Sequence, residues 1–303
     1  MKVLVTDGIE KVGSELMKKA GLEVVEKKLT PEELLAEIAN YNAIIVRSAT
    51  KVTKEVIDAG TQLKAIGRGG VGVDNIEVEY AKSKGIPTFN TPRASSISVA
   101  ELAIAHMFAA SRFLNTSSME MRQGNWPKKQ YAKGVELTGK TLGVLGFGNI
   151  GRECAKRAIG LGMKVIAYDP FVTDNFGMDV KLCAKDEVLA NADYITCHLP
   201  LIKGEPAAVG APEISKMKDG VIIINCARGG VVDECALLEG LKSGKVAAAG
   251  LDVYVNEPIT DAQKELINHP RVSATPHIGA STVEAQDRVG IEIAQKIIDA
   301  LKA

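Results

Sequence analysis

The chain has 303 residues, 46% of them apolar, which suits two domains with buried cores or one large domain. Lys and Arg together number 37, as do Asp and Glu, so no excess of positive charge indicates a nucleic-acid or anionic-membrane partner. No long apolar run predicts a membrane span, the N-terminus is too polar for a signal peptide, and the five cysteines lack metal-binding spacing. We therefore expect a cytoplasmic protein with reduced thiols and no metal.

Short β-branched segments alternate with helical segments along most of the chain. The predicted strands are Lys2–Thr6, Glu23–Lys28, Ala43–Arg47, Ala65–Gly67, Thr141–Leu145, Lys164–Tyr168, Tyr194–His198, Val221–Asn225, Ala248–Asp252 and Val272–Ala274. Apolar strands separated by helices are typical of parallel sheets covered on both faces. Because the pattern occurs before and after a long segment, Ser98–Gly139, we predict an α/β fold with two doubly wound parallel-sheet domains.

Two longer helices are predicted beside this pattern. Ser98, followed by Glu101, has the spacing of a capping box and predicts the start of a linking helix that ends near Arg112. A second helix, Ser281–Leu301, can return the C-terminus to the first domain. The predicted domains are residues 1–92 with 281–303, with a flavodoxin-like fold, and residues 93–280.

A glycine-rich segment directly follows the predicted strand Thr141–Leu145. Residues Gly146–Gly151 read GFGNIG, the GxGxxG pattern, and a predicted helix, Arg152–Ala158, comes next. In such a unit the first glycine permits a tight turn and the second lets the backbone approach a pyrophosphate. The third lets the helix pack closely on the strand. The second domain is therefore predicted to be a Rossmann domain that holds dinucleotide phosphates at a helix N-terminus.

The next strand of this domain, Lys164–Tyr168, ends in Asp169. An acidic residue about 20 positions after the glycines is placed to hydrogen-bond the adenosine ribose hydroxyls. Its charge would repel the 2′-phosphate of NADP, and no arginine follows in Asp169-Pro170-Phe171. The sequence thus predicts NAD as the cofactor.

Three residues suited to chemistry, Arg228, Glu257 and His277, each come shortly after a different predicted strand of this domain. The carboxyl ends of parallel strands are where open α/β sheets bind ligands. Guanidinium pairs well with carboxylate, and histidine beside a carboxylate is a common general base. Together the three residues predict a catalytic site.

The chain has three other histidines. His106 lies inside the predicted linking helix and is interpreted as a packing residue. His269 precedes a proline in a loop and is interpreted as solvated. His198 ends a predicted strand, where a structurally satisfied histidine is favoured over one that lines a cofactor crevice.

These residues lie in segments that resemble the D-isomer-specific 2-hydroxyacid dehydrogenase family: LGVLGFGNIGRE, NCARGGVVDE, AGLDVYVNEP and TPHIGAST. The resemblance covers essentially the whole chain and places the family's signature residues at Arg228, Glu257 and His277. It implies that His277 takes the substrate hydroxyl proton and that Glu257 bonds the other ring nitrogen. Arg228 is then expected to hold the substrate carboxylate and the developing carbonyl oxygen.

The glycine pattern and the resemblance together give a set of expected NAD contacts. They are Gly146, Gly148, Asn149, Ile150, Gly151, Asp169, Leu199, Cys226, Ala227, Arg228, Asp252, His277 and Gly279. Among them, Asp252 matches the family residue near the nicotinamide amide. Leu199 stands where many relatives carry threonine, so a hydroxyl contact to the cofactor is not expected there.

Within the family, VRSATKVT (Val46–Thr53), GRGGVGVDNI (Gly67–Ile76) and PHIGASTVEAQ (Pro276–Gln286) look most like the phosphoglycerate dehydrogenase branch. This likeness implies NAD-dependent oxidation of 3-phospho-D-glycerate to 3-phosphohydroxypyruvate, a step of serine biosynthesis. The expected substrate contacts are Arg47, Ser48 and Arg68 for the phosphate, backbone N–H groups around Gly70 and Val71 for the carboxylate, and Arg228 with His277.

Two other functions stay open. A reductase for glyoxylate, hydroxypyruvate or another 2-oxo acid would share the fold and the catalytic residues. An NAD-sensing corepressor on the same fold is a more distant alternative. The resemblance also implies a homodimer that pairs through the NAD-binding domain, with Ser98–Arg112 as the expected contact. Because the chain ends at Ala303, the C-terminal regulatory domains of longer relatives, and serine feedback through them, are not expected.

Overall fold

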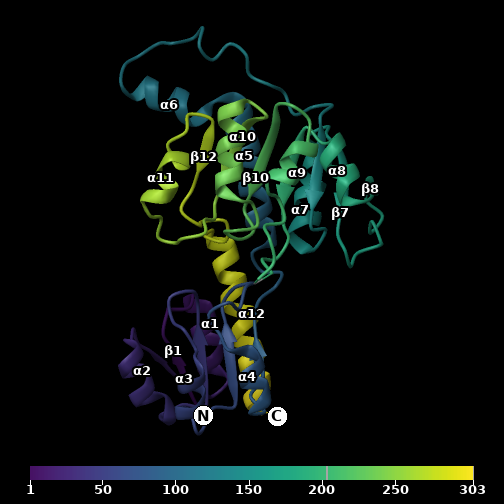
Figure 1. The fold of residues 1–303 in the computed structure, drawn as a ribbon. Coiled ribbons are helices and arrows are strands. Elements are labelled where there is room, and N and C mark those ends of the chain that lie inside the picture. Colours follow the sequence, from purple (N-terminus) through teal and green to yellow (C-terminus); the bar gives the residue numbers. More distant parts are fainter. Residues whose placement is uncertain (203, 303) are drawn as a thin grey trace. The chain divides into compact units, whose positions relative to one another are not determined.

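The computed structural model describes residues 1–202 and 204–302 and divides into two compact units (Figure 1). Unit 1 consists of Met1–Ser96 and the C-terminal residues from Ala280 onward, and unit 2 consists of Ile97–Gly279. The sequence predicts boundaries after residues 92 and 280. Each unit has its own parallel sheet and its own apolar core.

Unit 1 contains a five-stranded parallel sheet in the order β2-β1-β3-β4-β5, which is the flavodoxin-like arrangement. Its strands are β1 (Lys2–Val5), β2 (Glu23–Glu26), β3 (Ala43–Val46), β4 (Ala65–Arg68) and β5 (Thr88–Phe89). Its helices are α1 (Lys11–Lys19), α2 (Pro31–Glu37), η1 (Ile38–Asn40), α3 (Lys54–Ala59), α4 (Val78–Ser83) and α12 (Val283–Lys302). Helices α2, α3 and α4 cover one face, whereas α1 and α12 cover the other.

Helices α1 and α12 approach each other closely (Figure 1). A Cβ at Gly13 of α1 would lie 2.5 Å from the carbonyl oxygen of Gly290 in α12, so only glycine permits this spacing. Thr282 accepts a hydrogen bond from the backbone N–H of Ala285 and caps the start of α12. The C-terminal helix is thereby part of the core of unit 1.

Unit 2 contains a seven-stranded parallel sheet in the order β12-β11-β10-β9-β6-β7-β8. Its strands are β6 (Thr141–Leu145), β7 (Lys164–Tyr168), β8 (Val180–Leu182), β9 (Tyr194–Cys197), β10 (Val221–Asn225), β11 (Val246–Leu251) and β12 (Val272–Ala274). Its helices are α5 (Ser96–Arg112), α6 (Leu114–Arg122), α7 (Asn149–Gly160), α8 (Lys185–Asn191), α9 (Ala211–Lys216), α10 (Glu234–Ser243) and α11 (Asp261–Ile267). The order is the Rossmann order with one further strand, and it reverses between β6 and β9.

The prediction of two doubly wound parallel sheets is confirmed. Strands β5 and β8 were not predicted, because one has only two residues and the other, Val180–Leu182, carries a lysine at its centre. The predicted capping box is wrong, since α5 begins at Ser96 and Ser98 lies within its first turn. The N–H of Ser96 already bonds the carbonyl of Arg93, so the preceding turn runs straight into the helix.

Within the described ranges, no single helix is long and apolar enough to cross a membrane. Helices α5 and α6, which are bent by 67° relative to each other, satisfy the same length and composition test only as a pair. Much of α5 is buried, because Ala100, Ala103 and Met107 pack in the core of unit 2.

Candidate active site

The three glycines of the GxGxxG segment have different surroundings. Gly146 has a φ of +97°, and a Cβ there would lie 2.6 Å from the backbone of His198. A Cβ at Gly151 would lie 2.1 Å from the carbonyl oxygen of Gly146. A Cβ at Gly148, by contrast, would meet no described atom within 4 Å. The fold itself therefore requires Gly146 and Gly151, whereas Gly148 leaves open space of the kind that a pyrophosphate needs.

Helix α7 begins at Asn149, inside the glycine-rich segment and not at Arg152 as predicted. Its first N–H groups have no partners within the helix, so they and the positive end of the helix dipole suit an anionic ligand. The Arg152 side chain donates to the carbonyl of Phe147 at 3.0 Å and to Oδ1 of Asn149 at 2.8 Å. These bonds hold the turn in place from the helix side.

Asp169 lies beside this turn at the end of β7. Its Oδ2 accepts a 2.8 Å hydrogen bond from the N–H of Phe147, and its Oδ1 accepts from the N–H groups of Phe171 and Val172. A carboxylate has about four acceptor positions, so one position remains for a ribose hydroxyl. The open space at Gly148, the helix N-terminus and this fixed carboxylate together fit a dinucleotide.

His198 follows β9 next to Gly146, where the strand order reverses. Its Nε2 lies 3.0 Å from Oγ1 of Thr196, but its buried Nδ1 makes no hydrogen bond within the described residues. Burial lowers its pKa to about 4, so the ring is neutral at pH 7. The interpretation of His198 as structurally satisfied holds for one nitrogen only. The other makes His198 a candidate cofactor contact that the sequence prediction left out.

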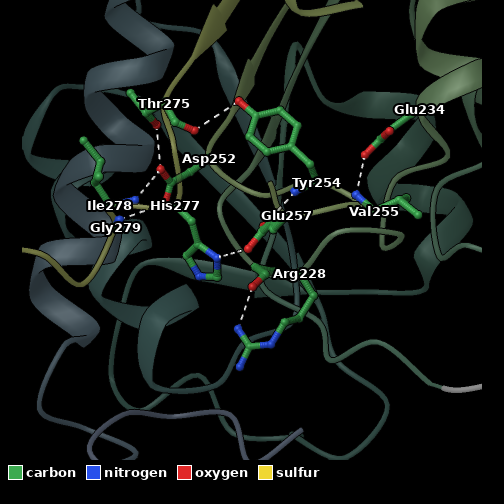
Figure 2. Close-up of polar contacts among 11 residues, drawn as sticks. Arg228, Glu234, Asp252, Tyr254, Val255, Glu257, Thr275, His277, Ile278 and Gly279 are labelled. Carbon is green, nitrogen blue, oxygen red and sulfur yellow. Dashed lines mark hydrogen bonds and ion pairs between the residues drawn. The ribbon is translucent and has the colours of Figure 1, made fainter. Parts of the chain in front are cut away.

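The three predicted catalytic residues, Arg228, Glu257 and His277, follow β10, β11 and β12, which are neighbours in the sheet. Glu257 Oε2 lies 2.6 Å from His277 Nδ1, so Nε2 of the imidazole is the nitrogen left for a substrate (Figure 2). The two side chains keep 36% and 48% of their surface exposed, which leaves them accessible to a ligand. The structure thus brings together two of the three predicted catalytic side chains in direct contact.

Glu257 is fixed by the loop that follows β11. Its Oε1 accepts a 3.0 Å hydrogen bond from the N–H of Tyr254, and Val255 N–H donates to Glu234 Oε1 at 2.7 Å (Figure 2). A Cβ at Gly229 would lie 1.8 Å from the carbonyl oxygen of Tyr254, so the loop after β10 packs against this loop backbone to backbone. Both loops are therefore held in one relative position.

The His277 segment is fixed by Asp252, which is 1% exposed. Asp252 Oδ1 accepts from Thr275 Oγ1 at 2.6 Å and from Ile278 N–H at 2.8 Å, and Oδ2 accepts from Gly279 N–H at 2.7 Å (Figure 2). His277 itself has a φ of +54°, a region that residues other than glycine rarely adopt. The carboxylate of Asp252 thus binds the segment on both sides of His277, which suits a positioning role.

Arg228 follows β10 and is only partly exposed. Its Nη1 donates to the carbonyl of Ala227 at 2.7 Å, and Asn225 Nδ2 donates to the carbonyl of Arg228 at 3.0 Å. Cys226 is buried, and burial raises the pKa of its thiol, so it is not a reactive nucleophile. Cys226 and Ala227 lie between the end of β10 and Arg228, and the N–H of Ala227 donates to Asn225 Oδ1 at 3.1 Å.

The predicted substrate residues of unit 1 lie at or just after the carboxyl ends of β3 and β4. Asp7 accepts hydrogen bonds from the N–H groups of Arg47 and Thr50, and Asn75 donates to their carbonyls. This fixes the loop that carries Arg47 and the exposed Ser48. Arg47 also lines a pocket with about 210 Å³ of empty space, together with Gly8, Ile9, Glu10, Ile45, Gly69, Gln286, Val289, Gly290 and Ile293.

Arg68 is the last residue of β4, and its side chain lies over Gly70, where a Cβ would clash with Nη1. Val71 follows and is partly exposed, and its carbonyl accepts from Asn90. Arg47 and Arg68 therefore belong to the carboxyl ends of two adjacent strands.

Residues 104–279 match the model of the D-isomer specific 2-hydroxyacid dehydrogenase NAD-binding domain. The chain is 49% identical to hydroxypyruvate reductase of Thermotoga maritima, over 99% of this chain and 98% of that protein. It is 48% identical to D-3-phosphoglycerate dehydrogenase of Archaeoglobus fulgidus, of which it spans only 58%.

Among solved structures, it resembles a glyoxylate reductase from Paecilomyes thermophila, with a TM-score of 0.91 and 33% identity over 100% of this chain and 95% of that one. It also resembles D-lactate dehydrogenase from Aquifex aeolicus, complexed with NAD and lactic acid, with a TM-score of 0.87 and 29% identity over 99% of this chain and 95% of that one. These relatives support NAD as the cofactor of unit 2.

The glycine surroundings predict that two alanine substitutions fail for different reasons. Gly148→Ala should leave the thermal midpoint without NAD within about 2 °C of the wild type, because its Cβ enters open space. It should weaken NAD binding by tenfold or more, on the order of 1.4 kcal/mol. Gly151→Ala should lower the midpoint even without NAD, because its Cβ meets the Gly146 carbonyl. Calorimetry and thermal melts check both, and an unchanged NAD affinity in Gly148→Ala would refute the assignment.

Proposed function

The chain belongs to the D-isomer specific 2-hydroxyacid dehydrogenase family, and within it we propose that it oxidises 3-phospho-D-glycerate to 3-phosphohydroxypyruvate with NAD. The observation that carries the substrate choice is the position of Arg47 and Arg68 at the ends of the adjacent strands β3 and β4. Two guanidinium groups are well suited to the oxygens of a phosphate. The chemistry at C2 of the substrate rests on the residues of unit 2.

His277 acts as the general base in this proposal. Its Nδ1 is bonded to Glu257, so Nε2 accepts the proton of the C2 hydroxyl, and the carboxylate stabilises the imidazolium that forms. Arg228 holds the substrate carboxylate and the oxygen that becomes a carbonyl. Bound NAD supplies the acceptor for the hydride from C2. Its pyrophosphate and adenosine ribose would be held by Gly148, the α7 N-terminus and Asp169. Asp252 lies in the loop that carries Glu257, and Cys226 and Ala227 lie directly before Arg228.

Reduction of hydroxypyruvate is the second candidate. The Thermotoga maritima relative with that name matches over nearly its whole length, whereas the chain spans little more than half of the phosphoglycerate dehydrogenases. Hydroxypyruvate and 3-phosphohydroxypyruvate undergo the same change at C2 and differ only in the 3-phosphate. The two candidates therefore differ in what Arg47, Ser48 and Arg68 must recognise.

A substrate panel separates the two candidates. We expect kcat/KM for 3-phospho-D-glycerate to exceed that for D-glycerate, and Arg47→Gln and Arg68→Gln each to lower the former at least about tenfold through loss of a charged hydrogen bond. Activity on D-glycerate should stay nearly constant in both variants. Lys64→Gln, which removes a charge next to the other end of β4, is the matched control. A wild type that prefers hydroxypyruvate and glycerate would favour the reductase.

The catalytic assignments predict distinct kinetic failures. His277→Ala should lose roughly 10²–10⁴ in kcat, the usual share of a positioned base, with NAD binding nearly unchanged. Glu257→Gln should lose less, because it keeps a hydrogen-bonding group but removes the charge. Arg228→Lys should raise KM as well as lower kcat, since it keeps the charge without the bidentate fork. Near-normal turnover of His277→Ala in steady-state assays would show that the base lies elsewhere.

We further infer a homodimer formed through unit 2. Helix α6 has no buried residues, and although Asn115 in its first turn bonds Ser273 of β12, the loop that follows α6 extends away from the sheet (Figure 1). The large apolar side chains exposed there include Leu114 at 50%, Met119 at 61%, Met121 at 51% and Trp126 at 76%. Helix α5, the contact expected from the sequence, buries much of its apolar surface in the core of its own unit. The α6 segment is therefore the better candidate for the dimer contact.

Sedimentation analysis checks this inference. The wild type should behave as a dimer, and a Met119→Glu/Trp126→Glu double variant should dissociate at micromolar concentrations, because two charges would be buried in an apolar contact. Ile291→Glu, at an exposed apolar position of α12 in unit 1, should remain dimeric. A monomeric wild type would contradict the inference directly.

A further inference from the structure

His106 makes contacts that its position inside a core helix does not require. It is 2% exposed on α5, and its ring bridges the hydroxyl of Ser273 in β12 and that of Thr275 just after the strand. Nδ1 lies 2.8 Å from Ser273 Oγ, and Nε2 lies 3.1 Å from Thr275 Oγ1. A Cβ at Gly250 would lie 2.5 Å from the His106 Cβ, so β11 makes room for this side chain. The interpretation of His106 as a packing residue therefore omits its main contacts.

The hydrogen-bond partners determine where the protons lie. Thr275 donates its only hydroxyl proton to Asp252, so Thr275 Oγ1 must accept from His106, and His106 must carry its proton on Nε2. Burial lowers the pKa of His106, which leaves the ring neutral and Nδ1 bare. Ser273, which accepts from Asn115 Nδ2 at 2.9 Å, then donates its own proton to Nδ1. Each bond in this series, from Asn115 to Asp252, therefore joins one donor to one acceptor.

This series of hydrogen bonds leads to the segment that carries His277. Asp252, which accepts from Thr275, also bonds the N–H groups of Ile278 and Gly279, the two residues that follow His277. Because His277 has a φ of +54°, its backbone needs such support on both sides. Asp252 gives this support by accepting from Thr275 on the N-terminal side of His277 and from Ile278 and Gly279 on the C-terminal side.

We propose that His106 is a positioning residue for His277, acting as a neutral imidazole that donates from Nε2 to Thr275. It thereby supports the clamp on the His277 segment, which is the set of hydrogen bonds that Asp252 accepts from Thr275, Ile278 and Gly279. The proposal rests on the proposed role of His277 as the base. His106 touches neither substrate nor cofactor in this scheme. It acts by fixing Thr275 and Asp252, and so the distance of His277 Nε2 from the reacting hydroxyl.

Two amide variants of His106 distinguish the contribution of Nε2 from that of Nδ1. Gln at position 106 places a donor near the Nε2 position, whereas Asn places polar atoms near the Nδ1 position only. We expect His106→Gln to keep most of the turnover and His106→Asn to lose about tenfold in kcat, with the NAD dissociation constant unchanged, because small displacements of a base are costly. Ser111→Ala, which removes another buried polar contact of α5, is the control for stability and should leave kcat unchanged.

A double-variant cycle tests whether His106 acts through Thr275. Thr275→Val removes the shared hydroxyl, so His106→Asn should have no further effect on kcat in its presence. Equal kcat values in His106→Gln and His106→Asn, or multiplied losses in the double variant, would overturn the proposal and reduce His106 to a packing residue.

Two measurements do not depend on catalysis. Nitrogen NMR at pH 7.5 should show a neutral His106 protonated on Nε2, and amide exchange at Ile278 and Gly279 should be faster in His106→Asn than in His106→Gln. A ring protonated on Nδ1, or equal exchange in both variants, would refute the positioning role even if the enzyme used another substrate. If both hold while no 2-hydroxy acid is oxidised, the clamp stands and the proposed function fails.

Discussion

Parallel pairing of β10, β11 and β12 is the constraint on which the candidate catalytic site depends. Parallel neighbours end on the same edge of a sheet, so the loops after these strands meet even though they are far apart in the chain. Glycine lets them meet closely, because Gly229 packs directly against the backbone of Tyr254. The 2.6 Å contact between Glu257 and His277 follows from this arrangement.

Buried polar groups hold the loops once the sheet has brought them together. A buried carboxylate is costly unless it is hydrogen-bonded, and Asp252 meets this condition only when Thr275, Ile278 and Gly279 all lie in place. The cost of leaving it unsatisfied therefore favours one conformation of the His277 segment. Asp7 and Asn75 do the same in unit 1 for the loop that carries Arg47. In both units a buried or half-buried network fixes a loop that carries a candidate functional side chain, Arg47 in unit 1 and His277 in unit 2.

The sequence alone determined the fold class and the NAD-binding unit, and it predicted the residues of the candidate catalytic site. Strands such as Thr141–Leu145 and Val221–Asn225 match their predicted bounds, because buried parallel strands are short, continuous apolar runs with clear ends. The GxGxxG pattern and Arg228, Glu257 and His277 were legible for a related reason. Each is a local departure from its surroundings, either glycines in a row or a charged residue immediately after an apolar strand.

Only the tertiary structure decided what these residues touch. The GxGxxG pattern predicts a different role for each glycine, but only the structure shows backbone close to Gly146 and Gly151 and open space at Gly148. His106 and Thr275 are 169 positions apart, so no periodicity or spacing connects them, and the position of the proton on the ring follows from the partners alone. Side-chain hydrogen bonds between distant strands and helices depend on how the elements pack. Local sequence carries no record of that packing.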